Sequence, residues 1–233
     1  MTERQKFHAE IIYLILAALF IASLVTSNLI FQKFFYWHPF DYTIFESRLF
    51  ELSVGILPYP ITFLITDLIS EIYGKKKANE VVVVGIFASF FSMGIILISN
   101  YVPAMETSPI DDATFSKVFS LSPLAVLASM LAYLFAQFVD IRIYHFWKNL
   151  TNGKMLWLRN NFSTFLSQLI DTSVVVALLC FFGVLPWELF FGLLLSGFIF
   201  KVCVAAIDTP FLYLFVWMFR KKFDLKVNEE IKL

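Results

Sequence analysis

Six long apolar segments, separated by short polar stretches, make up most of this chain. Each reaches the roughly 20 residues that a helix needs to cross the hydrocarbon core of a bilayer. Inside a membrane a helix satisfies its own backbone hydrogen bonds, so segments of this length predict transmembrane helices. We expect them at about 11–32, 52–73, 81–101, 123–144, 162–184 and 188–219, within a single membrane domain that covers residues 1–233.

The last segment is too long for one perpendicular crossing, because a helix rises about 1.5 Å per residue. We expect it to tilt strongly, to break near Pro210, or to run on past the membrane surface. The loop at 33–51 is rich in aromatic residues, which favours an interfacial position on the outer face. The loop at 103–122 is acidic, and we expect it to be extracellular.

Composition confirms that this pattern belongs to an integral membrane protein. Hydrophobic residues make up 59% of the 233 residues and charged residues 15%, whereas soluble domains average about 45–50% and 25%. Cys180 and Cys203 both fall inside apolar segments, and His8, His38 and His145 fall in tails, loops or helix ends. We therefore expect no metal, no cofactor and no intramembrane enzyme. The predicted fold is an all-α, six-transmembrane-helix bundle.

Lysine and arginine are distributed asymmetrically along the chain. Fourteen of the 18 basic residues lie in the amino-terminal tail, the second and fourth loops, and the carboxy-terminal tail. Three lie in the other loops, and Lys201 lies inside the last segment. Since cytoplasmic loops carry the excess of positive charge, this pattern predicts that both termini are cytoplasmic.

The second apolar segment contains two acids, Asp67 and Glu71, and is followed by three lysines. Ionisable groups at membrane depth are costly and mark functional sites. On a helix these two carboxylates are four residues apart and lie on one face, about 5–6 Å from each other. They would repel unless a cation, a shared proton or a hydrogen-bond donor lies between them. This segment is therefore expected to face a site in the interior of the protein.

Other polar residues repeat at helical spacing and fall on one face of their segments. They are Tyr133, Gln137, Asp140 and Tyr144 in the fourth segment, Thr164, Ser167, Gln168 and Asp171 in the fifth, Lys201 and Asp208 in the last, and Thr26, Ser27 and Asn28 near the outer end of the first. Asp171 lies near the middle of the bilayer. Lys201 needs a carboxylate partner, for which the candidates are Asp67, Asp140, Asp171 and Asp208. These residues predict one shared interior cavity.

Structural roles are the alternative for several of these residues. Glu71 and Asp140 lie near cytoplasmic ends, from which a side chain reaches the membrane surface. Serine, threonine and glutamine side chains join helices for about 0.6 kcal/mol each without touching a ligand. Arg159, Asn160 and Asn161 lie where the fifth segment begins, a position where asparagine caps a helix.

Two long motifs carry a family resemblance. They are GILPYPITF at 55–63 with TD at 66–67 and EIYGKK at 71–76, and WLRNN at 157–161 with SQLIDT at 167–172. The chain closely resembles the queuosine precursor transporter family. This resemblance implies a bacterial inner-membrane importer of 7-cyano-7-deazaguanine and 7-aminomethyl-7-deazaguanine, which feed queuosine in transfer RNA. The family also looks like the substrate-binding membrane subunits of energy-coupling-factor vitamin transporters, and such a subunit needs a separate ATP-driven module.

The chemistry of the residues agrees with such a ligand. A guanine-like edge offers two adjacent N–H donors to a carboxylate and an oxygen to an amide or a cation. Gln168 with Asp171, or Gln137 with Asp140, offers this pairing, and Asp67 with Glu71 offers a second carboxylate site or a coupling proton. The candidate substrate-binding residues are Asp171, Gln168, Asp67, Glu71, Gln137, Asp140, Asn28 and Lys201.

A flat base also needs a face on which to stack. The candidates for it are Tyr59, Phe63, Tyr133 and Trp157. The expected partners are the deazapurine and membrane lipid, without direct nucleic-acid contact, and an energising partner or a homo-oligomer stays open. A structural or assembly protein is a further alternative, which would tolerate neutralisation of the acids.

Overall fold

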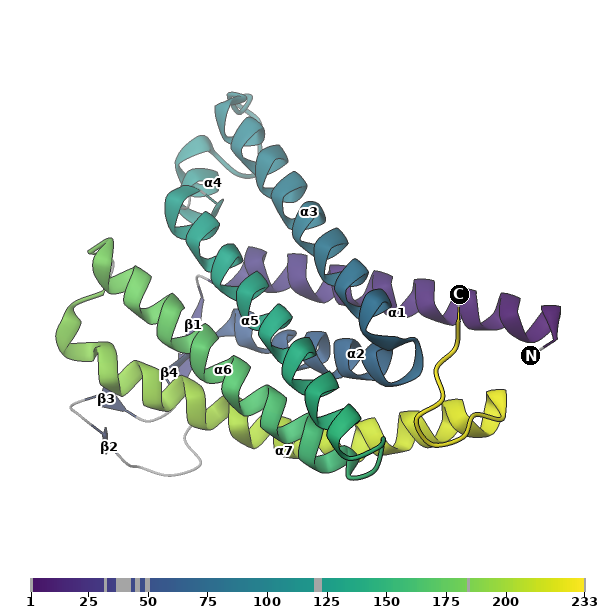
Figure 1. Ribbon diagram of the computed structural model, residues 1–233. Helices are drawn as coiled ribbons and strands as arrows, with labels where there is room; N and C mark the ends of the chain where they lie inside the picture. The colour runs from purple at the N-terminus through teal and green to yellow at the C-terminus, as the bar shows by residue number, and fades with distance from the viewer. Residues whose placement is uncertain are drawn as a thin grey trace.

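The structure is a computed structural model that describes residues 2–31, 33–36, 43–44, 47–48, 51–119, 123–183 and 185–232, with side chains outside 34, 36–51 and 120–129. Long helices dominate it (Figure 1). In chain order the elements are α1 (Glu3–Ile30), β1 (Phe34–Tyr36), β2 (Thr43–Ile44), β3 (Ser47–Arg48), β4 (Glu51–Ser53), η1 (Val54–Ile56), α2 (Tyr59–Ile72), α3 (Gly74–Tyr101), α4 (Asp112–Phe119), α5 (Pro123–Leu150), α6 (Leu156–Phe181), η2 (Trp187–Leu189) and α7 (Phe190–Phe223).

The long helices confirm the class of all-α membrane protein. In the described part of the chain, five stretches are long and apolar enough to cross a membrane: Glu3–Ile30, Val54–Ile72, Gly74–Tyr101, Leu156–Phe181 and Trp187–Phe223. Helix α5 covers the remaining apolar segment, and its side chains are described from Met130 onward. Two small antiparallel pairs, β1 with β4 and β2 with β3, lie between α1 and α2.

Helix α2 lies at the centre of the bundle. It packs against α1, α3, α5 and α7, while α5 runs along α6 and α6 along α7. Ten of its residues are buried, and they include every polar side chain from Thr62 to Glu71. The main hydrophobic core surrounds α2 and contains Phe20, Phe63, Ile69, Val82 and Leu212. Because α2 is enclosed, its polar residues can face only other helices.

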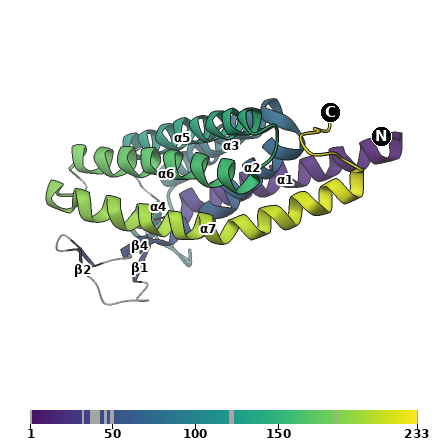
Figure 2. The same cartoon turned by 60° about the horizontal axis from the view of Figure 1, so that its bottom comes forward.

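Both termini lie at the same end of the bundle (Figures 1 and 2). The Tyr73 hydroxyl at the α2–α3 turn donates to the Ala9 carbonyl of α1 at 2.9 Å. The Ile231 N–H of the carboxy-terminal tail donates to the Ile72 carbonyl at 2.7 Å. We call this the basic end, because it also holds the lysines at 75, 76 and 77 and the basic residues at the end of α7.

The turn between α2 and α3 is unusually tight. Helix α2 ends at Ile72 and α3 begins at Gly74, which has φ of +85°. A Cβ atom at Gly74 would lie 2.3 Å from Glu230 Oε2 in the carboxy-terminal tail. Both the backbone conformation and the packed tail therefore require glycine here.

Several helix boundaries differ from those predicted. The three lysines form the first turn of α3 instead of a loop, and α6 begins at Leu156, before the predicted start at 162. Of the three alternatives for the last segment, the break near Pro210 was wrong, since α7 is continuous through it and runs on to Phe223. A proline removes one backbone hydrogen bond, which a packed helix tolerates. The predicted loop at 103–122 contains α4. The aromatic loop at 33–51 falls mostly outside the described residues.

Candidate functional site

A column of polar side chains runs between α2, α5, α6 and α7. On α2 it follows Tyr59, Thr62, Thr66, Asp67 and Glu71, which recur at spacings of three or four residues, with one adjacent pair, and so lie along one side of the helix. The facing helices add residues at the same spacing, so the column forms three successive layers. We name these layers the Asp171 cluster, the Asp67–Asp140 pair and the Glu71 cluster.

The Asp171 cluster joins α2, α6 and α7. Lys201 Nζ donates to Asp171 Oδ2 at 2.7 Å and to Thr172 Oγ1 at 3.1 Å. The Tyr59 hydroxyl donates to the same Asp171 oxygen at 2.5 Å, and Lys201 Nζ lies 4.5 Å from the centre of the Tyr59 ring. The prediction that Lys201 pairs with a buried carboxylate is thus confirmed, with Asp171 as the partner.

Aromatic rings and two glutamines surround this ion pair. The rings of Tyr59, Phe63 and Tyr133 lie within 5.2 to 6.2 Å of one another between centres. Gln137 Nε2 donates to the Tyr133 hydroxyl at 2.7 Å. Gln168 lies beside the Tyr59 side chain, and its buried Oε1 atom has no donor within the described residues. The cluster therefore combines an aromatic wall, whose rings meet at angles of 42° to 86°, with an ion pair and a free amide oxygen.

The Asp67–Asp140 pair lies between α2 and α5. Both side chains are buried, and the two carboxyl groups interact with each other. Ser167 Oγ donates to Asp140 Oδ1 at 2.9 Å, whereas Asp67 Oδ1 and Asp140 Oδ2 have no partner within the described residues. Two neighbouring buried carboxylates repel each other, and a shared proton relieves this repulsion. The alternative in which Asp140 reaches the membrane surface was wrong, because α6 covers it completely.

The Glu71 cluster lies closest to the basic end. Arg159 Nη2 lies 2.7 Å from Glu71 Oε2, and Arg220 Nη2 lies 2.6 Å from Glu71 Oε1. The Tyr144 hydroxyl donates to Oε2 at 3.0 Å, and Lys148 Nζ lies 3.8 Å from the same atom. The Glu71 side chain is only 1% exposed. The alternative in which Glu71 reaches the membrane surface was therefore wrong as well.

Lys148 also fixes the carboxy-terminal tail. Its Nζ donates to the Ser70 and Glu71 carbonyls at 3.3 and 3.2 Å and pairs with Glu230 at 2.7 Å. The tail thus lies across the end of α2, above the Glu71 cluster. In this arrangement the column is covered at the basic end.

Three cations of the Glu71 cluster were missed as site residues. Lys148, Arg159 and Arg220 count among the basic residues that predict the cytoplasmic side, yet Lys148 and Arg159 are at most 2% exposed at their side chains. The sequence contained one signal for Lys148. It lies four residues after Tyr144 and so falls on the same helix face as Gln137, Asp140 and Tyr144. No comparable signal marked Arg220, whose partner Glu71 is 149 residues away.

Asn160 and Asn161 do not cap α6. The helix begins at Leu156 without a side-chain cap. Both amides instead donate to Thr209 Oγ1 of α7, each at 3.2 Å. These two residues therefore have a structural role, but the role is to join α6 to α7 and not to cap α6. Trp157 does not reach the aromatic wall either, since its side chain is 52% exposed at the basic end.

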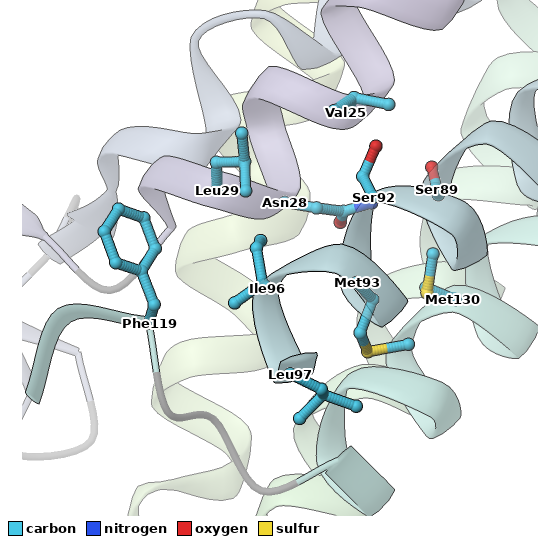
Figure 3. Close-up of a pocket in the computed structure, with 10 residues that line it drawn as sticks. All are labelled: Val25, Asn28, Leu29, Ser89, Ser92, Met93, Ile96, Leu97, Phe119 and Met130. Carbon is cyan, nitrogen blue, oxygen red and sulfur yellow. The ribbon is translucent and has the colours of Figure 1, made fainter. Parts of the chain in front are cut away.

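Asn28 lies apart from the column. It lines a separate small cavity of about 40 Å³ between α1 and α3, with Ser89, Ser92 and Met130. Figure 3 shows the Asn28 amide directed from α1 toward the two serines of α3. The buried Asn28 Nδ2 and Ser89 Oγ have no partner within the described residues. A cavity of this size suits one or two water molecules. The expectation of one cavity shared with Asn28 was thus wrong.

The first segment contributes to structure elsewhere. The Ser27 hydroxyl donates to the Gly55 carbonyl, which joins α1 to the start of the α2 region. Within the described residues, no group of three or more His, Cys, Asp or Glu side chains is placed to hold a metal ion.

The long apolar helices and the buried, paired charges between them define a multi-pass membrane protein with a polar site in its interior. Residues 53–215 match a family model described as "Putative vitamin uptake transporter". The chain is also 30% identical to the "Probable queuosine precursor transporter" of Bacillus subtilis (strain 168), over 162 residues that cover 69% of this chain and 70% of the relative. No solved structure matches. The chain therefore belongs to the family that this model describes, and it is related to the queuosine precursor transporters.

The region that matches the family model contains most of the column. Asp67, Asp140, Asp171 and Lys201 all lie within it, whereas Asn28 and Arg220 lie outside. The matched region thus covers the Asp171 cluster and the Asp67–Asp140 pair completely, and the Glu71 cluster without Arg220.

Proposed function

We propose that this chain imports 7-deazapurine precursors of queuosine, namely 7-cyano-7-deazaguanine or 7-aminomethyl-7-deazaguanine, across the bacterial inner membrane. The observation that carries this proposal is the Asp171 cluster. It places a carboxylate and a lysine 2.7 Å apart beside three aromatic rings, in the interior of a transporter. The name of the relative from Bacillus subtilis supports the same class of ligand.

In this proposal, the base exchanges partners with Lys201. The Asp171 carboxylate accepts the two adjacent N–H groups of the guanine-like edge, and the freed Lys201 ammonium donates to the neighbouring carbonyl oxygen of the base. Gln168 Oε1, which has no donor within the described part of the chain, accepts a further N–H group. One ring of the group Tyr59, Phe63 and Tyr133 stacks on the flat base, and the other two contact its edges.

The Asp67–Asp140 pair serves the second stage of transport in this proposal. It lies next along the column toward the basic end, so a base that leaves Asp171 meets it on the way inward. An aminomethyl group is cationic, and a half-protonated pair of acids accepts it by releasing the shared proton. Gln137, which is held by Tyr133 and lies 3.4 Å from Thr66 Oγ1, lines the route between the two layers.

The same proposal places six spans in the membrane as a single domain over residues 1–233, with both termini in the cytoplasm. The positions of the termini at one end, together with the basic residues there, support this orientation (Figure 1). The Glu71 cluster and the carboxy-terminal tail then close the column on its cytoplasmic side. In this proposal, the structure represents a state of the transporter in which the column is closed toward the cytoplasm.

The second candidate function is a ligand-binding membrane subunit of a multi-component vitamin or nucleobase transporter. The family description, which refers to vitamin uptake, supports it together with the resemblance to substrate-binding subunits of energy-coupling-factor vitamin transporters. The two functions share the Asp171 site and differ in energy supply. Purified protein in liposomes separates them, since an independent importer accumulates or equilibrates the base without any added protein.

The proposed function is tested by measuring queuosine in transfer RNA. The host is a bacterium that neither makes the precursor nor carries its own importer, and it is fed nanomolar 7-cyano-7-deazaguanine. We expect this gene to restore queuosine, while an empty vector does not. Absence of queuosine, with the protein present in the membrane and with base binding absent in purified protein, would overturn the proposal. Binding without uptake would favour the second candidate.

A further inference from the structure

A cavity with basic lining lies at the basic end, on the outer side of the Glu71 cluster, with which it shares Arg159 and Arg220. It has a volume of about 520 Å³ and lies where α6 begins and α7 ends, beneath the start of the carboxy-terminal tail. Four basic residues line it: Lys154, Arg159, Arg220 and Lys221. No acidic residue lines it among the described residues. Such a cavity attracts an anion.

The positive charge of this cavity is only partly neutralised. Glu71 is the carboxylate shared by Arg159 and Arg220. Lys154 and Lys221 form no ion pair with any described residue, and Lys221 Nζ lies over the Trp217 ring, 5.1 Å from its centre. The cavity therefore retains an excess of about three positive charges after Glu71 is counted.

The backbone adds to this preference for anions. Helix α6 begins at Leu156, which lines the cavity, and the Trp157 N–H of its first turn donates to the Tyr213 hydroxyl at 3.1 Å. The helix dipole still favours an anion at this end. The buried Arg159 guanidinium, which also lines the cavity, keeps its Nε without a partner in the described part of the chain.

Most of the remaining lining is apolar, and part of it is exposed. Met155, Trp217 and Val227 line the cavity and are 57%, 58% and 56% exposed. The cavity lies at the end of the predicted span 188–219, at the depth of lipid headgroups. A free phosphate or phosphorylated metabolite has no contact to make with exposed apolar side chains, whereas a phospholipid has acyl chains to place there. The proposed deazapurine substrates are neutral or cationic, so they do not suit this cavity.

We propose that this cavity binds the headgroup of an anionic phospholipid. Lys154, Lys221 and the start of α6 hold the phosphate, and Trp217 and Met155 contact the first part of the acyl chains. Basic pockets between helices on the cytoplasmic side of membrane proteins bind anionic lipids in this way. The lipid also lies next to Arg220 and balances the charge that Glu71 leaves uncompensated. This inference does not depend on the identity of the transported base.

The test uses the full chain, purified in neutral detergent. Phosphatidylglycerol, phosphatidylcholine with the same acyl chains, or inorganic phosphate is added, and retained lipid is measured by native mass spectrometry. The variant carries Lys154→Gln and Lys221→Gln. The control carries Lys75→Gln and Lys76→Gln, which removes two exposed lysines from the same end. Neither pair forms a buried contact, so both proteins are expected to fold.

We expect the unmodified protein to retain phosphatidylglycerol in preference to phosphatidylcholine. Retention should fall on the order of tenfold in the Lys154 and Lys221 variant and remain unchanged in the control. An equal loss in both variants would overturn the proposal in favour of unspecific surface charge. Equal retention of both lipids would also overturn it. Displacement of the lipid by millimolar inorganic phosphate would assign the cavity to a free anion instead.

Discussion

The Asp171 cluster and the Glu71 cluster are two solutions to the same problem, a carboxylate buried between helices. Asp171 has one cation, Lys201, whose side chain is 11% exposed. Glu71 has three cations, and the Arg159 side chain is completely buried. A carboxylate with one reachable lysine can exchange that lysine for a ligand. A carboxylate held by two guanidinium groups stays in place, because releasing it leaves several buried charges unpaired.

The positions of the two clusters fit these different roles. Arg159 and Asp171 are 12 residues apart on α6, or about 18 Å along its axis. The Asp67–Asp140 pair lies between them. The Asp171 cluster is thus suited to binding, and the Glu71 cluster is suited to closing the basic end. Neutralising the two carboxylates separately should therefore produce different kinds of defect.

The largest effect on stability is expected from Glu71→Gln. This change leaves Arg159, Arg220 and Lys148 close together without a full counter-charge, which costs about 3–5 kcal/mol at a buried site. Thermal unfolding of the purified protein, and its yield in the membrane, measure the loss. Glu106→Gln, in an exposed loop, is the matched control. Wild-type stability in Glu71→Gln would contradict the structural role of this cluster.

Asp171→Asn should affect transport more than stability. An amide cannot accept two N–H groups as a carboxylate does, so we expect uptake to fall about tenfold or more. Lys201→Gln should have a smaller effect, since it removes one donor and leaves the Asp171 charge available. Queuosine in transfer RNA, normalised to protein in the membrane, gives both values. A larger defect in Lys201→Gln would reverse the proposed roles of the pair.

Asp67→Asn should be well tolerated by the fold. An amide removes the repulsion between the two carboxylates and can donate an N–H group to Asp140, so we expect stability to change by no more than about 1 kcal/mol. Its effect should appear in the pH dependence of uptake. If the pair carries a coupled proton, uptake by Asp67→Asn no longer responds to external pH. Uptake that depends on pH equally in Asp67→Asn and in the unmodified protein would exclude the pair from coupling.

The smallest effect is expected from Glu230→Gln. The Glu230 side chain is 39% exposed, although its partner Lys148 is buried. A partly exposed ion pair contributes about 1 kcal/mol or less, and Lys148 keeps its two backbone carbonyl acceptors. Thermal unfolding should shift slightly, and uptake should remain. Loss of folding in Glu230→Gln would show that the tail contributes far more to closure than its contacts indicate.

Much of this arrangement follows from the sequence, because periodicity identifies the faces of helices. The apolar segments gave the class of fold, and the spacing of Gln137, Asp140, Gln168 and Asp171 gave the inner faces of α5 and α6. The solvation cost of Lys201 required a buried carboxylate. These inferences depend only on positions within one helix and on the cost of an unpaired charge.

Contacts between distant segments could not be predicted in this way. The pairing of Glu71 with Arg220 depends on how α2 and α7 pack, and charge counting treats Arg220 as a solvated residue of the basic side. Asn28 shows the same limit, since its spacing does not reveal that its face packs against α3. The early start of α6 at Leu156, which brings Arg159 into a helix, had no strong signal in the apolar pattern.

Direct binding of 7-cyano-7-deazaguanine to purified protein tests the central claim, that Asp171 recognises the base. Calorimetry on the unmodified protein, Asp171→Asn and Glu106→Gln separates recognition from transport and from any energising partner. An analogue without the 2-amino group removes one of the two N–H donors. We expect binding by the unmodified protein and Glu106→Gln, and an affinity lower by about tenfold or more for Asp171→Asn and for the analogue. Equal affinity in all four cases would contradict the claim.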